Sequence, residues 1–101
     1  MDILAKLKRK KVVLLDGQEH ELPPMDLTTL ANIQEALGFT LMELETKMKE
    51  DPVKVSRDLS YAVLREIHPE ITKDEAGHLV SMAELQGIIE AIAGVTGEMK
   101  G

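Results

Sequence analysis

The sequence predicts one α+β domain, mainly helical, in which an N-terminal β-hairpin is followed by a compact bundle of about five short helices. Three observations support this fold class: Asp16-Gly17 separates two extended runs, helix start signals recur along the rest of the chain, and no repeat or linker divides it. The 101 residues are close to the commonest domain size, and 44% are apolar, so a single domain over residues 1–101 can bury a core.

A β-hairpin is expected at residues 11–22. Its first arm, Lys11–Leu15, is apolar and β-branched, whereas its second arm, Gln18–Leu22, is mostly polar, so one face of the hairpin should be open to water. Asp16-Gly17 between the arms favours a two-residue turn in which both central residues have positive φ.

The edge of this hairpin is the first candidate interface. An isolated two-stranded hairpin is only marginally stable, so it must lean on helices or pair with a strand of a neighbouring subunit. Val12 and Leu14 are the residues that we expect at such a contact. Residues 1–10 are a basic lead-in, expected either to be solvated or to touch an acidic surface, a membrane or another subunit.

The first helix is expected to run from its N-cap, Asp26, to about Leu37. Pro23-Pro24 ends the preceding strand, because proline lacks the backbone donor that a β-ladder needs. Gly38 fits the left-handed position that commonly follows a helix. One side of this helix is apolar and should face the core: Leu27, Leu30, Ile33 and Leu37.

A second short helix should begin at Thr40, which forms a capping box with Glu43. Three residues make up its apolar face: Leu41, Leu44 and Met48. Met42 lies off that face, so we expect it to be exposed and treat it as a candidate interface residue.

The longest helix is expected at about Val53–Ile67. Asp51-Pro52 supplies an N-cap and a proline at the first helical position, and Pro69 ends the helix. Apolar residues cover more than half of its circumference, so the other helices should pack against it. Glu66 is the one acid in that arc, expected either to reach water at the core edge or to form a buried or interface carboxylate.

A short helix follows between Thr72 and about Val80. Thr72 and Glu75 form its capping box, because a Thr side chain and a Glu three residues later can satisfy each other's backbone donors. Together with the helix after it, this element completes a helical bundle that we expect over residues 26–93.

The last helix should begin at Ser81, which forms a capping box with Glu84, and run to about Ala93. Its apolar face contains five residues: Met82, Leu85, Ile88, Ile89 and Ile92. Residues 94–101 are rich in glycine and are expected to form a flexible tail.

A stripe of small residues marks the last helix as a second candidate interface. Ala83, Gly87 and Ala91 repeat every fourth residue, opposite much of the apolar face. Small residues let another helix approach closely, and the alternative is a plain solvated face. Gly87 costs roughly 1 kcal/mol in a helix interior relative to Ala, which favours a packing role. The stripe and the hairpin edge together suggest a homo-oligomer.

No catalytic, cofactor or metal site is expected. The chain has no Cys, and no two of His20, His68 and His78 have the spacing that places two imidazoles on one helix turn. It contains neither a glycine-rich phosphate loop nor a recognisable nucleophile motif. We therefore expect a non-enzyme that works by binding.

Charge and hydropathy limit the partners. The first 11 residues carry a charge of +4 and the other 90 carry −10, so the body should repel nucleic acid. The chain lacks both a signal-peptide pattern and the roughly 20 apolar residues that span a bilayer, so we expect a soluble, cytoplasmic protein. With six Met, two aromatic residues and no Trp, its contacts should be aliphatic and adaptable.

The order of these features resembles the small tail assembly chaperones of long-tailed bacteriophages. The resemblance rests on the hairpin at 12–22, on the Leu22–Leu27 lead into the first helix, and on Tyr61–Val80. In the region that corresponds to Tyr61–Val80, many members of this family have an apolar helix that ends at His-Pro. An acidic turn that begins with Thr follows, and then a helix that contains a Gly. The matching residues here are His68, Pro69, Thr72, Glu75 and Gly77.

The resemblance implies a binding role. Such chaperones bind the long, largely helical tape measure protein, keep it soluble in the host cytoplasm, and are displaced as tail tube subunits polymerise around it. They are generally absent from the mature virion, and many are also made as a longer, frameshifted product.

Two alternatives stay open. A virion structural protein, such as a head–tail connector or completion protein, would share the size and the phage context but remain in the particle. A small acidic adaptor or inhibitor of a cellular protein would bind one basic partner tightly, with strong salt dependence.

Overall fold

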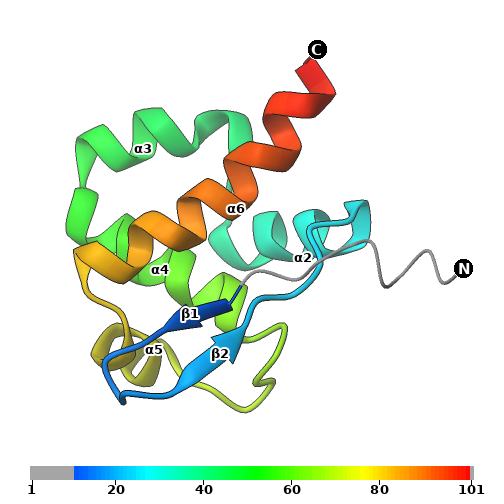
Figure 1. The fold of residues 1–101 in the computed structure, drawn as a ribbon. Helices are drawn as coiled ribbons and strands as arrows, with labels where there is room; N and C mark the ends of the chain where they lie inside the picture. The colour runs from blue at the N-terminus through cyan, green and yellow to red at the C-terminus, as the bar shows by residue number, and fades with distance from the viewer. Residues whose placement is uncertain (1–10, 101) are drawn as a thin grey trace, which may run out of the picture.

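The computed structural model describes residues 11–100, with side chains through residue 92, and confirms the predicted fold class. An antiparallel hairpin of β1 (Lys11–Val13) and β2 (Glu19–Glu21) lies against a set of packed helices (Figure 1). The helical elements follow in this order: α2 (Leu27–Leu37), the short 3₁₀ helix η1 (Leu41–Glu43), α3 (Leu44–Glu50), α4 (Pro52–Leu64), α5 (Lys73–Leu79) and α6 (Met82–Lys100).

The hairpin closes through a three-residue loop, residues 15–17, and not through the predicted two-residue turn. The Leu14 N–H donates to the Gln18 carbonyl at 3.1 Å, and the Gly17 N–H donates to the Leu14 carbonyl at 2.9 Å. Within this loop Gly17 has a φ of 77°, whereas Asp16 stays at negative φ. A tight turn followed by one left-handed glycine therefore sets the register, and no second residue with positive φ is needed.

Both predicted ends of α2 are confirmed. Asp26 Oδ1 accepts a hydrogen bond from the Thr29 N–H at 2.8 Å, which caps the N-terminus and lowers the pKa of Asp26. Gly38 follows the helix at a φ of 84°, and its N–H donates to the Gln34 carbonyl at 2.9 Å.

The predicted capping boxes also mark element starts. Glu75 accepts from the Thr72 N–H at 3.0 Å, and Glu84 accepts from the Ser81 N–H at 2.9 Å, at the beginnings of α5 and α6. The box at Thr40 instead opens η1, which leads directly into α3.

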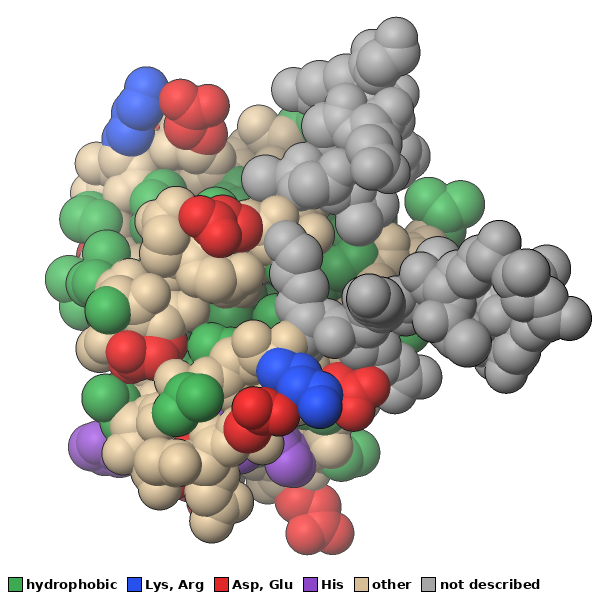
Figure 2. Space-filling model, in the orientation of Figure 1, with side chains coloured by type: hydrophobic (Ala, Val, Ile, Leu, Met, Phe, Trp, Pro, Cys, Tyr) green, Lys and Arg blue, Asp and Glu red, His purple; other side chains and the backbone are tan. Residues whose placement is uncertain are grey.

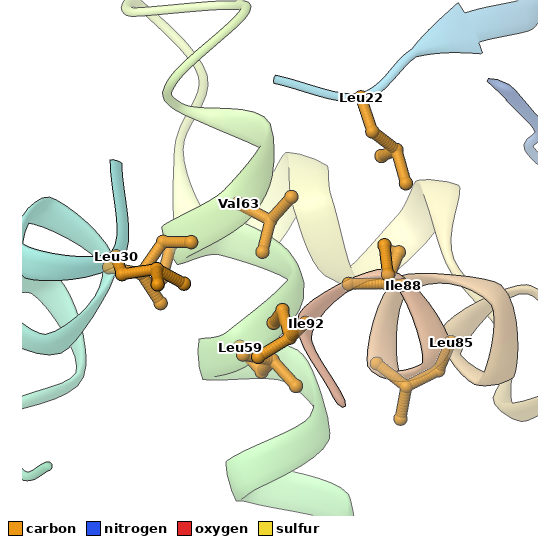
Figure 3. Packing of buried hydrophobic residues seen from close by; sticks show 10 residues of the cluster. Leu22, Leu30, Leu59, Val63, Leu85, Ile88 and Ile92 are labelled. Atoms are coloured by element: carbon orange, nitrogen blue, oxygen red, sulfur yellow. The ribbon is translucent and has the colours of Figure 1, made fainter. Parts of the chain in front are cut away.

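The central helix is α4, as its wide apolar arc predicts. It contacts α2, α3, α5 and α6. Figure 3 shows leucine, isoleucine and valine side chains from α2, α4, α6 and the segment after β2 converging in the core. The buried residues of this main core are Leu22, Leu30, Ile33, Leu59, Ala62, Val63, Leu85, Ile88, Ala91 and Ile92.

A smaller core lies where the hairpin covers the end of α4, and it overturns one predicted interface residue. Leu14 is 3% exposed and packs with Leu64 and Ala76, so it does not lie on an open edge. Because side chains alternate along an extended chain, the Leu14 side chain points inward and the Leu15 side chain points to solvent. The backbone N–H of Leu15 donates to the Leu79 carbonyl at 2.8 Å. The hairpin is thus fixed to the helices on its inner side.

Two helix ends differ from the sequence prediction. Helix α4 stops at Leu64, and its last carbonyl accepts from the N–H groups of Ile67 and His68 in a tightened turn before Pro69. Helix α6 continues to Lys100, so residues 94–100 of the predicted flexible tail are helical. Glycines cost a helix only about 1 kcal/mol each, and no proline interrupts this stretch. The basic lead-in, 1–10, lies outside the described residues.

Candidate functional site

Three apolar residues that periodicity places on the inner faces of helices are largely exposed. Leu27, Val53 and Met82 are 72%, 76% and 62% exposed. Each lies in the first turn of its helix. Helical periodicity gives the direction of a side chain, but it does not tell whether another element reaches far enough to cover it.

Val53 and Met82 border a groove of about 220 Å³ where α4 and α6 begin, which we call the α4–α6 groove. Val80 and Leu85 also line it, so most of its large side chains are apolar. Figure 2 shows hydrophobic side chains gathered on the left of the molecule, over the beginnings of these two helices. The groove has room for one or two apolar side chains and is smaller than a usual small-molecule pocket.

One charged residue, Arg57, lines the same groove, and its ionic partners lie beside it. Gly77 lets the stem of Arg57 lie close to α5, since a Cβ at Gly77 would be 3.2 Å from Arg57 Cγ. Arg57 Nη2 is 3.2 Å from Asp58 Oδ1, and Lys73 Nζ is 3.9 Å from the same oxygen. Two cations therefore share one carboxylate beside the groove, and the Glu84 carboxylate, which accepts from the N–H of groove-lining Ser81, places a negative charge at the same end.

The predicted interface residues divide into exposed and internal positions. Met42 is 87% exposed, as predicted, and Ala83 is also exposed. Ala91 is 7% exposed and belongs to the main core, so its predicted place on a face for another helix is wrong. Gly87 is half-buried under the hairpin, where an added Cβ would lie 3.9 Å from Cγ2 of the half-buried Val12. The small residues of the stripe thus do not share one open face.

Glu66 has a partner that sequence reasoning did not identify. Asn32 Nδ2 of α2 donates to Glu66 Oε1 at 3.2 Å, just after the end of α4. The carboxylate is half-buried, so it ties two helices together at the edge of the core.

A polar site lies at the opposite end of α4. His20 Nδ1 of β2 and His68 Nε2 are 3.1 Å apart, and His20 Nε2 is 3.0 Å from Asp16 Oδ2. The Gln18 N–H donates to the other oxygen of Asp16 at 3.0 Å. This bond is the main cause that lowers the pKa of Asp16, and the His20 contact adds to it. Asp16, His20 and His68 form one hydrogen-bonded chain. We call His20 and His68 the histidine pair.

The histidine pair borders an open pocket of about 600 Å³. Ile67, Ile71 and Leu79 give the pocket apolar walls. Sequence reasoning missed this pair because it looked for imidazoles within one helix turn, whereas these two are 48 residues apart. The fold of the hairpin over the end of α4 brings them together, and no local spacing signals it.

Comparison of the chain with protein-family models, with curated proteins and with solved structures finds no match. In the part of the chain that the structure describes, no three or more His, Cys, Asp or Glu side chains are grouped so that they could hold a metal ion. Among the described helices none is both long enough and apolar enough to cross a membrane.

Proposed function

We propose that this protein is a tail assembly chaperone of a long-tailed bacteriophage. It binds helical segments of the tape measure protein in the α4–α6 groove, keeps them soluble in the host cytoplasm, and releases them as tail tube protein polymerises around them. The sequence resemblance described above supports this role. The structural observation that carries the proposal is the pair of large apolar side chains, Val53 and Met82, left exposed beside an apolar groove.

The groove suits one face of an amphipathic helix. Such a helix places apolar side chains at every third or fourth position into a partner's groove. Because the groove holds only one or two side chains, each contact is weak, and a long client can be bound at many places and released again. Met82 adapts its shape to different side chains, which favours similar affinities for many related segments.

Charge supports the same role. Arg57 and Lys73 near the groove favour acidic residues that flank the apolar face of a client helix. The body as a whole is acidic, with a charge of −10 over residues 12–101. Molecules that coat one client with acidic surfaces repel each other, which keeps the loaded complex from aggregating. The proposed work needs no chemical step, so the protein acts as a non-enzyme.

Co-expression with the tape measure protein tests the proposal. We expect the wild-type chain to raise the soluble fraction of the tape measure protein and to co-purify with it. Met82→Asp places a charge in the apolar groove and should abolish both effects. Met42→Asp is the matched control, because Met42 is even more exposed but does not line the groove. Both substituted side chains are exposed, so each variant should keep its stability within about 0.5 kcal/mol.

The results of this experiment distinguish two claims: where the client binds, and whether the protein acts as a chaperone at all. Loss of co-purification in Met42→Asp but not in Met82→Asp would move the client surface to η1 and α3. Failure of the wild-type chain to change the solubility of the tape measure protein would overturn the chaperone function. So would its presence in fixed stoichiometry in purified virions, measured by mass spectrometry, because a chaperone of this kind is displaced before the tail is complete.

A further inference from the structure

The histidine pair has no part in the proposed client binding. His20 and His68 come from different elements, the hairpin and the turn after α4, and their ring nitrogens lie 3.1 Å apart beside an open pocket. The ring planes are nearly perpendicular, at 83°. We propose that His20 Nδ1 and His68 Nε2 bind a divalent transition-metal ion of the class of Zn²⁺.

The nitrogen spacing fits two ligands of one ion. Zn–N bonds of about 2.0–2.1 Å at the tetrahedral angle place two ligand nitrogens about 3.3 Å apart. The 3.1 Å between His20 Nδ1 and His68 Nε2 is within a few tenths of an ångström of this value. A metal ion can therefore take the place of the proton between the two rings when His68 carries its single proton on Nδ1, after a small outward movement and without rearrangement of the hairpin.

Asp16 prepares His20 for this role. A carboxylate accepts but does not donate, so Asp16 Oδ2 holds the proton of His20 on Nε2. His20 Nδ1 then presents a lone pair toward His68 Nε2, on the side where a metal ion would bind. Carboxylates in this position are typical partners of metal-binding histidines, because they fix the tautomer and the ring orientation. Asp16 is itself held by the Gln18 N–H, and the His20 side chain is only 10% exposed, so the arrangement is well supported.

The site is open on its remaining sides. The described residues offer no third grouped ligand, so water would complete the coordination of a bound ion from the open pocket. Glu70 lines the same pocket and is exposed, and Glu75 is already engaged by the Thr72 N–H. Two imidazoles select zinc, nickel or copper over magnesium and calcium, which prefer oxygen ligands.

Titration of the full chain with zinc chloride tests the site. Calorimetry should show saturable binding of one ion, and magnesium chloride should show none. His68→Gln and His20→Gln should each weaken binding at least about tenfold, which is the scale of lost ligand support at metal sites. His78→Gln is the matched control, because His78 lies in the last turn of α5, outside the pair, and it should keep the wild-type affinity.

Asp16→Asn tests the positioning role. The amide keeps an acceptor for Gln18 but presents an N–H group to His20 Nε2, which should move the proton to Nδ1 and weaken zinc binding about tenfold. Nitrogen chemical shifts of the imidazole report this change of tautomer directly. The proposal is overturned if the wild-type chain shows no saturable zinc binding. It is also overturned if a folded His68→Gln variant binds zinc as tightly as the wild type, or if His78→Gln loses as much affinity as His68→Gln.

Discussion

The two ends of α4 present different chemistry. At the N-terminal end, Val53 and Met82 leave an apolar groove open to water. At the C-terminal end, the hairpin covers Leu64 and brings His20 against His68. The first end is suited to weak hydrophobic contacts with a helix, and the second to a ligand with defined polar partners.

The two ends differ because neighbouring elements pack over the C-terminal end of α4 and leave part of its N-terminal end exposed. Leu64 and Val53 both belong to the apolar arc of α4. The Leu64 side chain is fully buried, whereas the Val53 side chain is 76% exposed. The arc sets which side of the helix turns inward along its whole length. The neighbouring elements then decide which part of that side becomes core and which part stays available as a binding surface.

The largest expected effect tests whether the C-terminal end is truly covered. Leu14→Ala removes a side chain that is 3% exposed and packs against Leu64 and Ala76, so it should lower the free energy of unfolding by about 2–5 kcal/mol. Leu15→Ala is the matched control: Leu15 is 57% exposed, and its loss should change stability by less than about 0.5 kcal/mol. Urea unfolding followed by circular dichroism measures both. Equal effects of the two variants would mean that the hairpin does not dock as described.

Features encoded by neighbouring residues could be predicted from the sequence. The capping boxes join residues three apart, such as Ser81 and Glu84, so their chemistry is visible in the chain itself. The central place of α4 follows from its wide apolar arc. The Asp16-Gly17 signal predicted a hairpin correctly but not its loop length, because a single left-handed glycine serves a three-residue loop as well.

The candidate sites depend on contacts that sequence spacing does not encode. The histidine pair joins residues 48 apart, and the Asn32–Glu66 hydrogen bond joins residues 34 apart. The groove depends on where α4 and α6 begin relative to each other, which periodicity leaves open. For the same reason Leu14 was expected at an edge, although the packing of the hairpin buries it.

A smaller change in stability, of the opposite sign, is expected at Gly87, on the side of α6 that faces the hairpin. Gly87→Ala should raise the free energy of unfolding by about 0.5–1 kcal/mol, because alanine favours a helix interior over glycine. The added Cβ would lie 3.9 Å from Val12 Cγ2, an ordinary contact. Gly38→Ala is the control with the reverse sign, since its φ of 84° strains any residue with a Cβ. Thermal unfolding measures both variants.

The same variant tests self-association through the small-residue stripe. If a second copy used Gly87 for close helix approach, Gly87→Ala would lower the mass measured by sedimentation while leaving the isolated fold intact. A gain in stability with an unchanged mass would instead assign Gly87 to the internal contact with the hairpin.

The smallest effect concerns the start of α6, at the groove end of the molecule. Hydrogen bonds from the Ser81 hydroxyl and, to a lesser degree, the Ser81 N–H lower the pKa of Glu84 below its ordinary value of 4.5. A carboxyl whose pKa is lower in the folded state contributes its full stabilisation above that ordinary value, and loses it as the pH falls through the folded pKa. Ser81→Ala removes the stronger donor, so unfolding free energies measured stepwise from pH 7 to pH 3 should fall less steeply in the acid range than those of the wild type. Ser81→Thr keeps the hydroxyl and should keep the wild-type slope. An unchanged slope in Ser81→Ala would show that the cap does not couple the groove end to pH, and would leave acid sensitivity to the other end of α4, where the pKa of Asp16 is lowered.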